Sequence, residues 1–138
     1  MQQFLFDTNL ISELRKGRRC DPALLWWFKT ISEDSCFLSV VTIGEIRFGI
    51  EHLRKRDARN SLNIELWLEE TSGAYGERIL PISAAIAEKW GKLRILCDGP
   101  VADGLIAATA SHHNLTVATR NEKDFENFGI KVFNPFSI

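Results

Sequence analysis

The sequence predicts an α/β fold in which helices cover both faces of a mostly parallel sheet. Short apolar runs of strand length alternate along the chain with longer segments whose apolar residues recur every three or four positions. Residues typical of helix starts, such as Asp, Thr, Asn and Pro, stand between several of these strands and helices. Strands that alternate with helices in this way are typical of a parallel α/β sandwich.

The composition is that of one ordinary globular domain. The chain has 138 residues, of which 45% are hydrophobic and 25% are charged, and we expect residues 1–138 to form a single domain. It contains 17 Lys and Arg against 18 Asp and Glu. This balance excludes the overall positive charge of a nonspecific nucleic-acid binder, although it is compatible with a local basic patch.

The expected compartment is the cytoplasm. The three cysteines lie far apart without a C-x-x-C spacing, which indicates neither a disulfide framework nor a zinc site. The apolar stretch near the N-terminus lacks the basic residues of a signal peptide. No apolar run approaches the roughly 20 residues that a membrane span needs.

The chain begins with a strand and a helix. Residues 4–6 form an apolar run that predicts the first strand, so Asp7 stands at the carboxyl end of that strand. Apolar residues at helical spacing follow. Thr8 or Asn9 is expected to cap this helix, because either side chain can accept a hydrogen bond from a free amide of the first turn. Gly17 is a suitable C-terminal stop.

The next elements are a helix, a strand and a second helix. An Asp-Pro pair predicts a helix over residues 22–31, because proline loses nothing at a first-turn position. The apolar run at residues 36–41 predicts the second strand. We expect Thr42 to cap the helix over residues 43–56, with Glu45 in its first turn as the capping-box partner.

The second half of the chain alternates in the same way. Helices are expected at residues 59–70, 83–93, 102–112 and 122–128, and strands at residues 79–82, 115–119 and 130–133. The first of these helices is expected to end before the Ser72-Gly73 pair. The small residues of the helix at 102–112 suit a central position against the sheet.

Four acidic residues follow predicted strands or open predicted helices, namely Asp7, Glu45, Asp103 and Asp124. Ligands of parallel sheets bind beyond the carboxyl ends of the strands, so the four can face one crevice. Each acid alone has another explanation, because Asp and Glu also favour helix starts. Four carboxylates about 5 Å apart would repel by roughly 3 kcal/mol per pair. A hard cation, Mg²⁺ or Mn²⁺, would neutralise them.

Four blocks of the sequence, each with one of these acids, resemble PIN domains of the VapC and FitB type. They read FLFDTNLIS (residues 4–12), LSVVTIGEIRFG (38–49), DGLIAATA (103–110) and TRNEKDF (119–125). The resemblance covers nearly the whole chain. It implies a PIN-like three-layer sandwich with a central five-stranded, mostly parallel sheet and helices on both faces. One departure is Gly104, where a bulkier small residue such as Ala is more usual.

The resemblance also implies a Mg²⁺-dependent endoribonuclease, with Mn²⁺ as a possible substitute. Such proteins are usually the toxin of a toxin–antitoxin pair and are commonly dimeric. The implied catalytic and metal-binding residues are Asp7, Glu45, Asp103 and Asp124, and those implied to orient carboxylates or water are Asn9, Thr119 and Asn121. The expected reaction is attack of a metal-activated water on an RNA phosphodiester, which leaves 5′-phosphate and 3′-hydroxyl ends.

Basic and aromatic residues suggest where partners bind. RNA phosphates could contact a basic run that contains Arg15, Lys16, Arg18 and Arg19, although cations also serve to solvate helix ends. Trp26 and Trp27 are neighbours on one helix, so they cannot both face the same core. One of them can contact a partner or lie partly buried under a neighbouring loop. The resemblance implies an antitoxin, whose arginine is expected to enter the acidic crevice.

Two other functions share some of these features. Aspartyl-phosphate phosphatases also place an acid after the first strand, but they need a second acid two residues later, where this sequence has Asn9. A PIN-like regulatory module that binds RNA or an antitoxin without catalysis stays open. In that case the four carboxylates would serve as helix caps.

Overall fold

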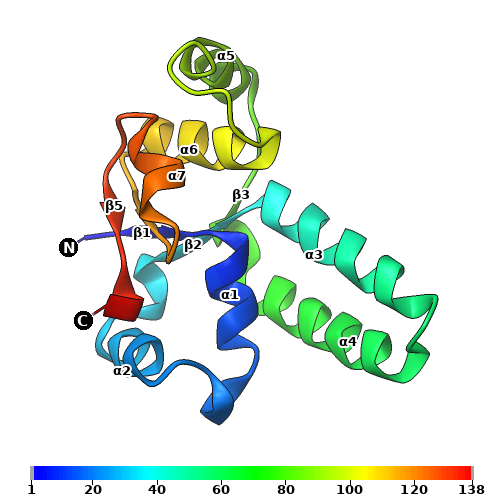
Figure 1. Cartoon of the computed structure of the whole chain (residues 1–138). Helices are drawn as coiled ribbons and strands as arrows, with labels where there is room; N and C mark the ends of the chain where they lie inside the picture. The colour runs from blue at the N-terminus through cyan, green and yellow to red at the C-terminus, as the bar shows by residue number, and fades with distance from the viewer. Residues whose placement is uncertain (1, 138) are drawn as a thin grey trace.

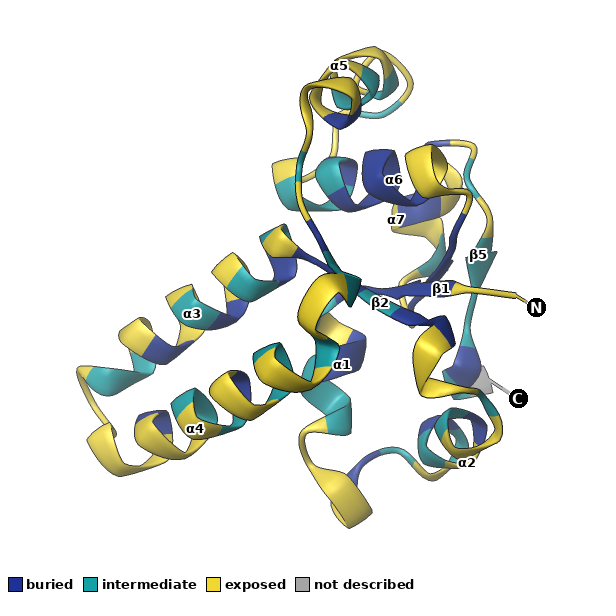
Figure 2. Cartoon of the chain, turned by 180° about the vertical axis from the view of Figure 1, so that it is seen from behind, coloured by how far each residue is buried: buried dark blue, intermediate teal, exposed yellow. Residues whose placement is uncertain are grey.

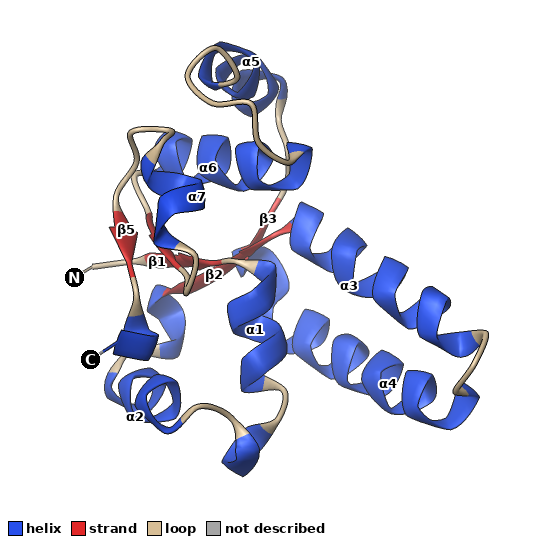
Figure 3. Ribbon diagram, viewed as in Figure 1, coloured by secondary structure: helices blue, strands red, loops and turns tan. Residues whose placement is uncertain are grey.

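A five-stranded parallel sheet forms the centre of the protein, whose computed structural model describes residues 2–137. All neighbouring strands pair in parallel, in the order β3-β2-β1-β4-β5. The strands are β1 (Phe4–Phe6), β2 (Cys36–Ser39), β3 (Ile79–Leu80), β4 (Thr116–Ala118) and β5 (Val132–Phe133). The first strand of the chain therefore lies in the middle of the sheet, between β2 and β4 (Figure 3).

Helices cover both faces of the sheet and complete three layers (Figure 1). They are α1 (Thr8–Leu14), α2 (Pro22–Thr30), α3 (Val40–Arg54), α4 (Ala58–Tyr75), α5 (Ala84–Leu93), α6 (Val101–His113) and α7 (Glu122–Glu126). Buried residues of α1, α2, α3 and α4 pack in one cluster, and those of α6 and α7 pack in another. The predicted α/β sandwich with helices on both faces is confirmed.

The two faces of β1 show how the cores form. Alternate side chains of a strand point to opposite faces, so Phe4 and Phe6 lie on one side and Leu5 on the other. The Phe4 ring meets the buried Trp27 of α2 edge-on, with 5.0 Å between the ring centroids. Leu5 belongs to the cluster that contains Ile106 of α6. All of these side chains are at least 94% buried, which fixes β1 between both layers.

Helices α3 and α4 form an antiparallel pair that projects beyond the sheet, with exposed residues along its outer side (Figure 2). Glu65 of α4 accepts hydrogen bonds from Arg47 and Arg54 of α3, which join two turns of α3 to one position on α4. No helix within residues 2–137 combines the length and the apolar character that crossing a membrane would require.

Two predicted helix caps are wrong, and both errors concern residues near the sheet. Asp7 caps α1, because its carboxylate accepts the Leu10 amide; neither Thr8 nor Asn9 does so. Helix α3 begins at Val40, and the side chain of Ser39 accepts a hydrogen bond from the backbone amide of Val41. Thr42 consequently lies inside the helix, and Glu45 lies in the second turn rather than in a capping box.

Helix α4 is longer than predicted. It continues through Ser72 and Gly73 to Tyr75, because Tyr75 still packs against the core. This packing offsets the cost of a helical glycine, about 1 kcal/mol. The helix ends at Gly76, whose φ of 53° is accessible to glycine. The remaining predicted elements are present. Strand β1 has the predicted bounds, and each of the other four strands is two residues shorter than expected.

Candidate functional site

Four helices bring one acid each to the carboxyl edge of the sheet. Asp7 caps α1, Glu45 lies in the second turn of α3, Asp103 lies in the first turn of α6, and Asp124 lies in the first turn of α7. All four line one hollow of about 130 Å³, which we name the acidic hollow. Its other lining residues are Thr8, Asn9, Asn121 and Phe125. The structure thus brings together the four predicted acids and two of the three predicted polar residues.

Asp7 is buried and firmly held at the base of the acidic hollow. Only 4% of the residue is exposed. One carboxylate oxygen accepts the Leu10 amide at 2.8 Å, and the other accepts the Thr119 hydroxyl at 2.6 Å. The Thr119 hydroxyl oxygen in turn accepts a hydrogen bond from the backbone amide of Asn121 at 2.9 Å. Thr119, the third predicted polar residue, therefore orients Asp7 from beneath the hollow.

The pKa of Asp7 is raised, chiefly by burial. The hydrogen bonds from Thr119 and from the Leu10 amide oppose this rise, while the negative charges of Glu45 and Asp124 add to it. A carboxylate has about four acceptor sites, and the two protein donors occupy two of them. Asp7 thus keeps acceptor capacity for a further ligand in a fixed orientation.

Glu45 is oriented by a threonine that follows the first acid. The Thr8 hydroxyl donates to Glu45 Oε1 at 2.5 Å and is also hydrogen-bonded to the buried hydroxyl of Thr42 at 3.1 Å. The sequence pattern does not reveal this role, because Thr8 and Glu45 lie 37 residues apart and Thr8 also suits a cap. Its position beside Asp7 is the one available signal.

The four acids share the hollow without basic partners. Burial, followed by the charges of Asp124, Glu45 and Asp7, raises the pKa of Asp103 to about 6. None of the four forms an ion pair with any residue of the described range 2–137, whereas Glu51 and Glu65 are paired with arginines. The acidic hollow therefore has a concentrated negative charge that a cation would relieve.

The donor set fits a hard divalent cation. The hollow presents carboxylate oxygens and the amide side chains of Asn9 and Asn121, with no thiol or imidazole, and oxygen ligands select Mg²⁺ or Mn²⁺. Within residues 2–137, no three acidic, histidine or cysteine side chains are placed so that they could hold a metal ion as they stand. Glu45 and Asp124 are exposed, and exposed side chains change rotamer within nanoseconds.

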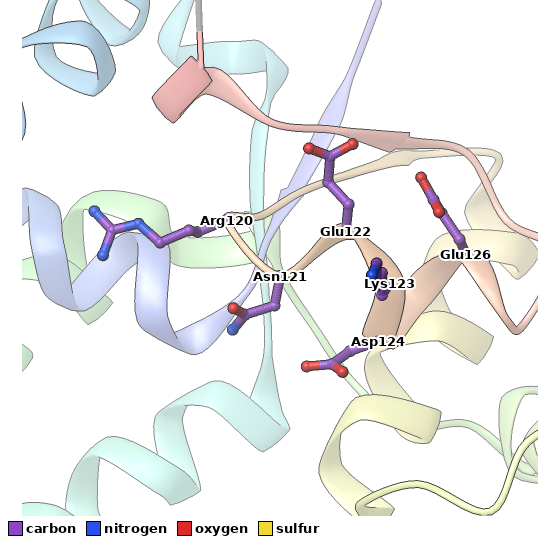
Figure 4. A pocket seen from close by; sticks show the side chains of 6 residues that line it. All are labelled: Arg120, Asn121, Glu122, Lys123, Asp124 and Glu126. Carbon is purple, nitrogen blue, oxygen red and sulfur yellow. The ribbon is translucent and has the colours of Figure 1, made fainter.

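A larger hollow, of about 470 Å³, borders the acidic one (Figure 4). It is lined by one stretch of chain, residues 120–126, with Phe125 excepted. Asn121 and Asp124 line both hollows, so the two adjoin. The Arg120 side chain extends away from Lys123 toward α1 (Figure 4). The smaller hollow is the candidate site, because it alone gathers acids from four separate helices.

The predicted basic run divides into two parts. Arg15 and Lys16 line a third hollow, of about 350 Å³, together with Arg120. Arg18 and Arg19 lie on a short 3-10 helix at residues 17–19 and line none of the three hollows. Arg120 is absent from the predicted set, because it is a single cation in a segment far from the run.

The family profile of the PIN domain matches residues 4–131 of this chain. The chain belongs to the PIN domain family. Toxin FitB of Neisseria gonorrhoeae is 34% identical over 137 residues, which cover 96% of this chain and 97% of FitB. VapC ribonuclease Y4jK of Sinorhizobium fredii is also 34% identical over 137 residues, covering 96% of each chain. The resemblance to PIN toxins of the VapC and FitB type is confirmed.

Solved structures give the same result for the fold. The crystal structure of FitAcB from Neisseria gonorrhoeae superimposes with a TM-score of 0.89 at 30% identity, covering 99% of this chain and all of that chain. A toxin–antitoxin complex from Klebsiella pneumoniae gives a TM-score of 0.69 at 29% identity, with the same coverage. This PIN protein therefore has the fold of FitB-type toxins.

Proposed function

We propose that this PIN protein is a Mg²⁺-dependent endoribonuclease and the toxin of a toxin–antitoxin pair. The observation that carries the proposal is the acidic hollow, where four carboxylates from four helices meet without a basic partner. Helix capping accounts for Asp7 alone, and first-turn dipole effects cover Asp103 and Asp124. Neither explains Glu45 in the second turn of α3. This argues against the alternative of a regulatory module whose acids are only caps.

Asp7, Glu45, Asp103 and Asp124 would hold Mg²⁺, with Mn²⁺ as a substitute. When bound, the ion would lower the pKa of a coordinated water and stabilise the charge that develops on the phosphate. Thr119 and the Leu10 amide keep the Asp7 carboxylate in place, as Thr8 does for Glu45. The buried Asp7 carboxylate is therefore preorganised and needs little rearrangement during reaction, whereas the exposed Glu45 and Asp124 can adjust to the ion.

Residues at the rim of the acidic hollow would act on water and RNA. Asp124 and Asn121 are exposed and border both the acidic hollow and its larger neighbour. Asp124 is placed to accept a proton from a water that attacks the phosphodiester, and the Asn121 side chain can orient that water. Asn9, exposed on the opposite helix α1, can do the same or contact the RNA.

An antitoxin is the proposed protein partner. Relatives with this fold include a structure described as a toxin–antitoxin complex, and an unpaired acidic hollow suits an arginine, which binds two carboxylate oxygens at once. A homodimer is also proposed. Exposed apolar side chains such as Phe48 (74% exposed) and Ile95 (87% exposed) suggest surfaces that a second chain would cover. An RNA substrate would place the activity in the cytoplasm.

The test replaces Asp7 by Asn. The variant keeps an oxygen that can accept the Leu10 amide, so α1 stays capped, but it loses the buried negative charge. Cleavage of RNA in the presence of Mg²⁺ is expected to fall at least 100-fold, in line with the loss of an electrostatic group at a reacting centre. The midpoint temperature of thermal unfolding of the metal-free variant is expected to equal or exceed that of the parent.

A matched control is available in Asp57. This residue also caps a helix, accepting the Asn60 amide at 3.1 Å, but it is exposed and lies at the start of α4. Asp57→Asn should cut RNA at the parent rate. If Asp7→Asn retains the parent rate as well, the assignment of the acidic hollow as the active site is wrong.

A further inference from the structure

The third hollow, which we name the basic hollow, adjoins the acidic one. Its volume of about 350 Å³ falls within the range of ligand pockets, about 300–1,000 Å³. The residues that matter here are Asn9, Ser12, Arg15, Lys16, Arg120 and Phe136. Asn9 and Asn121 line both hollows, so a chain molecule in the acidic hollow continues directly into the basic one.

The two hollows have opposite charge. Lys16 is neutralised by Glu13, with 2.8 Å between Nζ and Oε1. Arg15 forms no ion pair with any residue of the described range, and Arg120 has only a long contact of 3.9 Å with Asp21. A strand of nucleic acid has a phosphate at every nucleotide. With one phosphate at the acidic hollow, the next can lie against Arg15, where a cation lowers the cost of binding.

Arg120 also offers a flat surface. Its guanidinium carbon lies 4.0 Å from the centroid of the Phe136 ring, so one face of the group is covered by the ring. The side chain remains 54% exposed. Guanidinium planes and aromatic rings are the groups on which proteins stack unpaired bases of RNA. The guanidinium group of Arg120 thus contacts the Phe136 ring on one side, and the rest of the side chain is accessible to a ligand.

We propose that Arg120, backed by Phe136, stacks on one unpaired base of the RNA strand next to the scissile phosphate, while Arg15 contacts a neighbouring phosphate. The proposal rests on the ribonuclease function proposed above and makes Arg120 a substrate-positioning residue. Because the base must be unstacked from its neighbours, the segment that is bound must be single-stranded.

The experiment uses a single-stranded RNA oligonucleotide with one cleavage position. A series of substrates is made from it, each with an abasic nucleotide at a different position. The kcat and KM of cleavage are measured with Mg²⁺ for the parent protein and for Arg120→Ala and Arg120→Lys. Arg56→Ala is the control, since Arg56 is exposed at the far end of the α3–α4 pair. Binding of the same RNA series is measured in the Asp7→Asn background, where no cleavage is expected.

In the parent protein, one abasic position beside the cleaved bond should raise KM roughly tenfold, as expected for the loss of one stacked base. Arg120→Ala should raise KM roughly tenfold on intact RNA and no longer respond to that abasic position. Arg120→Lys keeps the charge but not the plane, so it should also lose the response. Arg56→Ala should retain it.

Two results would overturn the stacking role: an Arg120→Ala variant with the parent KM and abasic profile, or losses from the variant and the abasic position that simply add. Either result would leave the basic hollow to a protein partner. If the proposed ribonuclease function is wrong, the result differs: the RNA binds with the expected dependence on Arg120, but the protein does not cleave it.

Discussion

At the scale of single residues, Asp7 combines three roles that usually belong to different side chains. It ends β1, caps α1 and lies at the base of the acidic hollow. Its burial is unfavourable for a charge, and two hydrogen bonds compensate only in part, since the pKa remains raised. Asn at this position can keep the capping oxygen but not the charge, so the structural and the proposed catalytic roles of Asp7 can be separated.

Asp103 predicts a pH dependence of the metal-free protein. Its pKa of about 6 in the folded state lies above the ordinary value of 3.8, so the folded state holds the proton more tightly than the unfolded state. The contribution of Asp103 to stability is therefore fully present below about pH 4 and is lost as the pH rises through about 6. Urea unfolding in EDTA from pH 4 to pH 8 measures this loss.

The comparison variant is Asp103→Asn, which cannot titrate. Its stability relative to the parent should increase between pH 4 and pH 7, and added Mg²⁺ should raise the stability of the parent alone at neutral pH. A difference between parent and variant that stays constant over the whole range would contradict the origin assigned to this pKa.

At the scale of elements, the start of α6 is set by its contact with α5. Gly104, the residue after Asp103, is buried, and a Cβ there would lie 2.9 Å from Cδ1 and Nε1 of Trp90. The indole Nε1 is buried without a hydrogen-bond partner in the described part of the chain. The resemblance to PIN domains implies a bulkier residue such as Ala at position 104. Glycine in its place allows the ring of Trp90 to lie directly on α6.

Gly104→Ala is expected to destabilise the protein by about 1–3 kcal/mol, because the added methyl group overpacks the contact with Trp90. The start of α6 should shift with it, so RNA cleavage should also fall. The measurements are urea unfolding and the cleavage rate. Trp90→Leu in the same chain removes the clashing atoms and should restore part of both.

Gly73→Ala serves as the control, because a Cβ at this helical glycine meets nothing within 4 Å. It should stabilise the protein by about 0.5–1 kcal/mol through the unfolded chain. If Gly104→Ala is stabilising to the same degree, the close approach of Trp90 does not constrain α6.

The elements also show what a sequence can and cannot predict. Apolar periodicity located every strand and α-helix of the described residues, and the acids that follow the strands indicated the candidate site, because both signals are local. The predicted cap of α3, Thr42, is wrong, and the observed cap is Ser39. Both residue types cap helices well, so only tertiary packing selects between them. Arg120 is absent from the predicted basic set, because its proposed role depends on a contact with Phe136, 16 residues away in the sequence.

At the scale of the whole molecule, the charged hollows and the exposed tryptophan lie on different elements. The acidic and basic hollows lie side by side at one edge of the sheet, whereas Trp26 stands on α2 with 65% of its surface exposed. The neighbouring Trp27 is only 6% exposed. The expectation that just one of the two tryptophans faces the core is confirmed, and Trp26 is the one left for a partner.

Trp26→Ala is expected to weaken binding of the antitoxin while leaving RNA cleavage and thermal unfolding of the free protein unchanged. Trp27→Ala should instead destabilise the fold by about 3–5 kcal/mol, because its ring packs against Phe4, Phe6 and Phe133. Each variant is co-expressed with the candidate antitoxin, and the affinity and residual cleavage are measured. Equal affinity of parent and Trp26→Ala would remove α2 from the interface.

The hydrogen bond between Thr119 and Asp7 joins residues 112 positions apart, and this separation has a consequence during protein synthesis. The ribosome makes β1 first, but β1 lies at the centre of the sheet and gains its second neighbour only when β4 has been made. Asp124 follows later still. A growing chain therefore lacks both the hydroxyl that orients its first acid and its fourth acid. The message being translated next to it is safe from the proposed nuclease until synthesis is nearly complete.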